Sequence, residues 1–156
     1  MKSPILCIRI SRRATAAVVL ADEQLAFYDG RHLRSNTPAA LKGIARYTEL
    51  LLNQTRPASI VLDCPMKGGS STNGLAAAVK AVATGANLPC YEIDSAALCL
   101  AYGLAKAVTR LQMRSLVEPM FTELATFRGK VKPYIVDATA AALFVESGTA
   151  LGTFGA

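Results

Sequence analysis

The chain has 156 residues, of which 52% are hydrophobic and 18% are charged, a length that predicts one domain over residues 1–156. Its composition excludes a membrane span, because no apolar run is long enough, and no signal-peptide pattern follows Met1, so we expect a soluble, cytoplasmic protein without a membrane partner. The 17 Lys and Arg against 11 Asp and Glu give a net charge of +6, which favours a polyanionic partner such as nucleic acid without establishing one.

The first predicted strand, residues 4–10, is apolar on both faces, as in an internal strand of an α/β sheet. It carries one charge, Arg9. Because burying an unpaired guanidinium is costly, Arg9 should lie where the strand emerges at a cleft or should contact carboxylates from other elements. A lone arginine at a strand end, extending its head to water, is the alternative.

Two more apolar runs, 15–20 and 24–28, follow a basic turn at Arg12 and Arg13, and together they predict an antiparallel meander of three strands. Thr37 followed by proline is typical of a helix start, and the helical pattern continues to residue 55. The next apolar strand, 59–64, carries Asp63 near its end, in the position that Arg9 has in the first strand.

The Gly/Ser-rich stretch 67–74 lacks the order Gly-Lys-Ser/Thr of a phosphate loop, so it is either a plain connector or a mobile loop in which Lys67 touches a backbone phosphate. A helix, a fifth strand at 90–93 and further helices up to residue 124 come next, with a kink or a fresh helix start at Pro119. A basic loop then runs from Arg128 to Lys132, and Asp137 is expected to open the last, alanine-rich helix.

This order of elements is that of the ribonuclease-H-like fold, a five-stranded mixed sheet whose first three strands are antiparallel, flanked by helices. The run Ile5-Leu6-Cys7-Ile8-Arg9 resembles the first strand of RuvC-type Holliday-junction resolvases, which ends in a catalytic Asp. Ile60-Val61-Leu62-Asp63 is similar to their fourth strand, which ends in a catalytic Glu, and the segment from Asp137 to Ala142 resembles their last helix.

The resemblance implies that Asp63 and Asp137 hold the positions of catalytic carboxylates, which in such nucleases bind two Mg²⁺ ions. The chain departs from the pattern at Arg9, where the family has Asp, and at Tyr134, where it has a second helix acid. We therefore expect a vestigial site in which Arg9 pairs with both carboxylates and no metal cofactor is bound. The simpler interpretation, in which Asp63 merely ends a strand and Asp137 merely caps a helix, stays open.

Three functions remain as hypotheses. The first is a catalytically degenerate RuvC-like domain that binds branched or duplex DNA mainly through phosphate contacts. The residues expected to make those contacts are Arg12, Arg13, Lys67, Arg128, Lys130 and Lys132. The second is an active, Mg²⁺-dependent Holliday-junction or structure-specific endonuclease, in which Glu92 or Asp94 joins Asp63 and Asp137 as a third carboxylate. The third is a protein-interaction subunit that has lost both DNA binding and chemistry.

The resembled resolvases act as dimers, which leaves a homodimer open for this chain. Tyr102, Leu111 and Phe121 are candidates for its interface and equally good candidates for the core.

Overall fold

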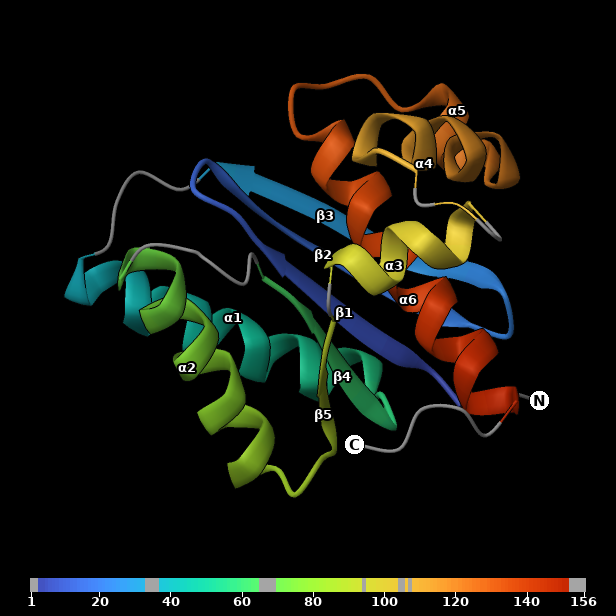
Figure 1. The fold of residues 1–156 in the computed structure, drawn as a ribbon. Helices are drawn as coiled ribbons and strands as arrows, with labels where there is room; N and C mark the ends of the chain where they lie inside the picture. The colour runs from blue at the N-terminus through green and yellow to red at the C-terminus, as the bar shows by residue number, and fades with distance from the viewer. Residues whose placement is uncertain are drawn as a thin grey trace.

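The structure, a computed structural model, describes residues 3–32, 37–64, 70–93, 95–103, 106 and 108–151. A five-stranded mixed sheet in the order β3-β2-β1-β4-β5 forms its centre (Figure 1). Its strands are β1 (Ile5–Ile10), β2 (Ala14–Ala21), β3 (Gln24–His32), β4 (Ser59–Asp63) and β5 (Cys90–Glu92). The first three strands are antiparallel, while β4 runs parallel to β1 and to β5, which confirms the expected fold class.

Helices cover both faces of the sheet (Figure 1). The bounds of the helices are α1 (Pro38–Thr55), α2 (Ser70–Gly85), α3 (Ser95–Tyr102), α4 (Arg110–Val117), the 3₁₀ turn η1 (Glu118–Met120), α5 (Thr122–Thr126) and α6 (Lys132–Leu151). The helices α1 and α2 lie on one face, and α3 to α6 lie on the other. The predicted break at Pro119 is confirmed by the 3₁₀ turn that separates α4 from α5.

The alternation of side chains along β1 decides which layer each residue enters. Leu6, Ile8 and Ile10 pack in the core beneath α1 and α2, whereas Ile5 and Cys7 pack in the core beneath α6. Arg9 continues the second series, so its side chain lies on the α6 face of the sheet. All six residues of β1 are buried, as expected for a strand with neighbours on both sides.

The sequence placed two boundaries wrongly. The strand β3 continues beyond Tyr28 to His32, because it pairs with the whole length of β2. The last helix begins at Lys132 and not at Asp137, since a proline at position 133 is compatible with the first turn of a helix. Asp137 therefore lies inside the second turn of α6 and does not cap the helix.

The start of α1 is as predicted, with the Thr37 side chain accepting a hydrogen bond from Ala40 N at 3.1 Å. Within the described ranges, no helix combines the length and the apolar character that crossing a membrane requires.

Candidate functional site

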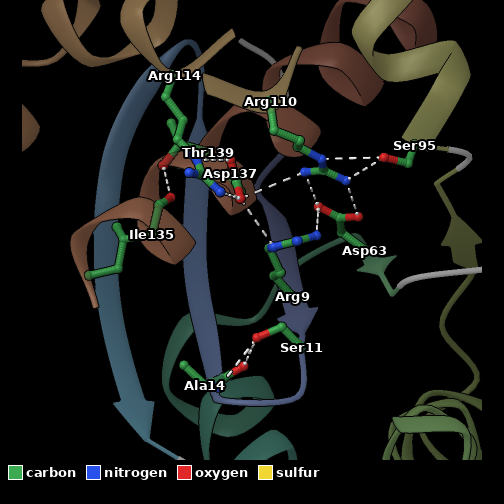
Figure 2. Close-up of polar contacts among 10 residues, drawn as sticks. All are labelled: Arg9, Ser11, Ala14, Asp63, Ser95, Arg110, Arg114, Ile135, Asp137 and Thr139. Atoms are coloured by element: carbon green, nitrogen blue, oxygen red, sulfur yellow. Dashed lines mark hydrogen bonds and ion pairs between the residues drawn. The ribbon is translucent and has the colours of Figure 1, made fainter. Parts of the chain in front are cut away.

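The site forms where the carboxyl ends of β1 and β4 meet the second turn of α6. In the parallel register of the two strands, Arg9 lies directly beside Asp63. Arg9 Nη1 is 2.9 Å from Asp63 Oδ2, and Arg9 Nε is 3.3 Å from Asp137 Oδ2 (Figure 2). The expected proximity of these three residues is thus confirmed. Both carboxylates have side chains that are 0% exposed, and the Arg9 side chain is 10% exposed.

Helix α4 adds two arginines that the sequence analysis did not assign to the site. Arg110 binds Asp63 through both ends of its guanidinium, with Nη1 and Nη2 each 3.1 Å from a carboxylate oxygen. Arg114 holds Asp137 in the same forked way through Nε and Nη2, both at 2.8 Å. Arg110 also donates from Nε and Nη2 to Ser95 Oγ, at 3.3 and 3.0 Å (Figure 2). The two-pronged geometry is the strong form of an arginine–carboxylate contact.

The local sequence of α4 explains why both arginines reach the carboxylates. Residues 110 and 114 are four apart and so share one face of the helix. A capping box fixes the start of the helix: Gln112 N donates to Thr109 Oγ1 at 3.1 Å, and Thr109 N donates to Gln112 Oε1 at 2.9 Å. The available sequence signal was the motif Thr-x-x-Gln at residues 109–112, together with arginines at positions 110 and 114.

Every carboxylate oxygen of Asp63 and Asp137 has a guanidinium nitrogen beside it. Arg9 contributes charge more than hydrogen bonding, because its Nε and Nη1 are buried and make no well-aligned hydrogen bond among the described residues. The cluster contains three cationic and two anionic side chains. We call Arg9, Arg110, Arg114, Asp63 and Asp137 the arginine–aspartate cluster.

Both arginines of α4 keep their charge. Burial disfavours the charged form of Arg110, but its hydrogen bonds to Asp63 and the negative charges of both aspartates outweigh burial and raise its pKa. For Arg114, the hydrogen bonds to Asp137 raise the pKa. In the neighbouring core, burial raises the pKa of the Cys7 thiol, so this group stays protonated at neutral pH.

The residues predicted to bind nucleic acid fall into two groups. Arg12 and Arg13 are exposed in the turn between β1 and β2, and Arg128 and Lys130 are exposed before α6. The placement of Lys132 in a free basic loop was wrong, because Lys132 begins α6, is 15% exposed and pairs with Glu118 at 2.5 Å. Lys67 lies outside the described residues.

Glu92 does not join the arginine–aspartate cluster. It pairs with Leu62 in the sheet, one residue before Asp63, so its side chain points to the opposite face and binds Lys80 of α2. Asp94, the other candidate for a third carboxylate, lies outside the described residues. In the part of the chain that the structure describes, no three His, Cys, Asp or Glu side chains gather as a metal site would require.

The three candidates for a dimer interface have different environments. Phe121 is a core residue at 5% exposure, and Tyr102 donates a hydrogen bond to Ala140 O at 2.8 Å. Leu111 is 71% exposed.

Comparison with known proteins identifies the fold. Neither a protein-family model nor a curated protein matches the chain. Among solved structures, Thermus thermophilus RuvC in complex with a Holliday junction substrate has a TM-score of 0.80 and 16% identity, with 97% of each chain covered. A second Thermus thermophilus RuvC structure has a TM-score of 0.78 and 17% identity, over 96% of this chain and 97% of that one. The yeast mitochondrial Holliday junction resolvase has a TM-score of 0.67 and 12% identity, over 90% of this chain and 76% of that one.

The fold is therefore RuvC-like and ribonuclease-H-like, as the order of the elements had predicted.

Two substitutions of an acid by its amide, one inside the cluster and one outside it, should differ strongly in their effect on the free energy of unfolding. Asp63→Asn removes a buried charge that faces two guanidinium groups, so the free energy of unfolding should fall by about 3–5 kcal/mol. Glu92→Gln, the control, breaks a solvent-exposed pair with Lys80 and should cost less than about 1 kcal/mol. Urea denaturation of both variants measures the difference, and equal losses would contradict the structural importance of the cluster.

Proposed function

We propose that the chain is a nucleic-acid-binding domain of RuvC-like fold that does not hydrolyse its substrate. The observation that carries this proposal is the position of Arg9, whose guanidinium lies between Asp63 and Asp137. In a two-metal nuclease, a cation held between carboxylates at one point activates water and stabilises the leaving oxygen. Here a covalently attached cation takes that place, and a guanidinium cannot coordinate a water molecule and lower its pKa as a metal ion does.

The residues of the cluster do not fit a pair of Mg²⁺ ions. Magnesium requires several free oxygens in near-octahedral geometry, and both carboxylates already accept from guanidinium groups. A divalent ion brought to about 4 Å from a guanidinium would meet a repulsion of roughly 8 kcal/mol at an effective dielectric constant near 20. Arg9 cannot move aside easily, because its backbone belongs to the central strand and its side chain is 10% exposed. This supports the absence of metal-dependent hydrolysis.

Nucleic-acid binding is supported by the charge of the exposed basic residues and by their position at one end of the sheet. Arg9 pairs with Ala16, and Ala16 pairs with Gly30, so these residues form one row across the sheet. A methyl group on Gly30 would lie 2.7 Å from Val131 Cγ2, which places the loop before α6 beside this row. Exposed Arg128 and Lys130 therefore lie toward the same end of the sheet as Arg12 and Arg13, where phosphates of one DNA backbone can contact both groups.

A second candidate function, an assembly subunit, has one observation in its favour. Among the described residues, large apolar side chains are exposed on α3, α4 and η1, namely Leu100, Leu111, Leu116 and Met120, and one more, Leu50, is exposed on α1. Exposed apolar side chains, where they adjoin on a surface, serve as contacts with other proteins. This candidate and DNA binding are compatible, because the two surfaces use different side chains.

The proposal predicts that the purified protein does not cleave a four-way junction with Mg²⁺ or Mn²⁺. Arg9→Asp alone should not create full activity, because Arg110 and Arg114 still occupy both carboxylates and Tyr134 stands where the resembled family has an acid. A gel-based cleavage assay on labelled junctions measures this, with Asp63→Asn as the control. Metal-dependent cutting by the unchanged protein that disappears in Asp63→Asn would show that the chain is an active nuclease.

Binding to DNA should fall steeply with salt, because neutralised phosphates release counterions. A site with about four phosphate contacts predicts a slope of roughly −3 to −4 for log affinity against log salt concentration, largely independent of sequence. Replacing Arg128 and Lys130 by alanine should reduce the slope to roughly −2, whereas the double change Lys42→Ala and Arg46→Ala, at two exposed positions of α1, should not change it. Fluorescence anisotropy on a junction and on a linear duplex of equal length gives the slopes.

Equal effects of the two double variants would indicate general polyanion affinity without a defined surface. Failure to bind either DNA at low salt would favour the assembly subunit. A preference for the junction over the duplex would support the likeness to the resolvases.

A further inference from the structure

The arginine–aspartate cluster carries more positive than negative charge, whereas a set of simple ion pairs would have equal numbers of both. Three guanidinium groups face two carboxylates, and the side chains of both aspartates are 0% exposed. A purely structural network needs only as many cations as anions, because each further buried cation adds a desolvation cost. The additional arginine therefore requires an explanation beyond holding β1, β4 and α6 together.

The hydrogen-bond donors of the cluster also exceed its acceptors. Three guanidinium groups carry about fifteen N–H donors, and two carboxylates offer about eight lone-pair positions. Ser95 Oγ accepts from Arg110, but Arg114 donates only Nε and Nη2 to Asp137, and its Nη1 has no partner among the described residues. The buried Nε and Nη1 of Arg9 also lack well-aligned hydrogen bonds to the residues that the structure describes.

The excess charge faces solvent. The side chains of Arg110 and Arg114 are 21% and 28% exposed, while the carboxylates beneath them are fully buried. The two aspartate side chains are 0% exposed, so only the guanidinium groups of the cluster have exposed surface, and Figure 2 shows these groups in contact with both carboxylates. A planar guanidinium with free N–H groups is the side chain best suited to a phosphate oxygen.

We infer that the arginine–aspartate cluster is a phosphate-binding site, in which Arg114, supported by Arg110, contacts a phosphodiester group of bound nucleic acid. Asp63 and Asp137 act as positioning residues, because they hold the two guanidinium groups in fixed orientations before the phosphate arrives. The fixed charge of Arg9 lies beneath the site and adds attraction without contacting the ligand. This inference rests on the proposed DNA binding and names the contact that it uses.

The direct test follows the arginine side chains in the unchanged protein. In ¹⁵N-labelled protein, titration with a short DNA duplex should shift the Nε–Hε signals of Arg110 and Arg114 in a saturable way. The Nε–Hε signal of Arg46, an exposed arginine of α1 on the other face of the sheet (Figure 1), is the internal reference and should shift less. Inorganic phosphate, as a second probe, distinguishes a site for small phosphate ions from a site for the DNA backbone.

A pair of variants gives the energetic counterpart. Arg114→Gln should reduce the log–log salt slope of duplex binding by about one, as expected for a lost phosphate contact, and Arg46→Gln on the opposite layer should leave it unchanged. Arg114→Lys keeps the charge and should retain the slope with weaker affinity, since lysine lacks the forked geometry. If Arg114→Gln fails to fold, the Arg114→Lys variant and the arginine signals of the unchanged protein still test whether Arg114 contacts phosphate.

Each outcome has a definite meaning. Salt-dependent DNA binding with unmoved Arg110 and Arg114 signals would overturn this inference and leave the proposed function intact. Absence of DNA binding would overturn both. Signals that shift with inorganic phosphate and not with DNA would show that the site takes a small phosphate ion, which also contradicts the inference as stated.

Discussion

The burial of Asp63 and Asp137 is the constraint on which the rest of this structure depends. Two carboxylates at 0% exposure are tolerated only with matched cations, and β1 supplies one while α4 supplies two. The resulting contacts join the central strands, the buried helix α6 and the helix that covers them. A short helix of eight residues such as α4 is thereby fixed against the sheet by side chains at both ends of its arginine face.

The same cluster connects the fold to its proposed function. In this chain, the fold brings a carboxylate from β4 and a carboxylate from α6 to one point, where metal-dependent hydrolysis would need bound Mg²⁺ ions. Three arginines of the chain itself supply the positive charge beside these carboxylates, and the side chains of Arg110 and Arg114 are partly exposed. An electrostatic site of this kind suits binding of a phosphate backbone, and it lies toward the end of the sheet where the exposed basic residues gather.

Features of the fold and the site that depend on strand order and burial could be predicted from the sequence. Parallel pairing of two apolar strands places Arg9 beside Asp63, as the strand order of the resembled fold had predicted. The helical start at Lys132 and its pairing with Glu118 depend on tertiary contacts, so Lys132 was wrongly placed in a loop. Arg110 and Arg114 were missed because arginines on a short helix usually face water, and only the fold shows that carboxylates lie beneath them.

The most direct measurement of the central claim is a titration with Mn²⁺, whose unpaired electrons broaden NMR signals of nearby nuclei. The account predicts that the backbone amide signals of Ile10 and Ala138, which adjoin the cluster, broaden no more than that of Val79 in α2, on the other face of the sheet. Selective, saturable broadening of the Ile10 and Ala138 signals would contradict the account, because it would show that a divalent metal enters the site despite Arg9.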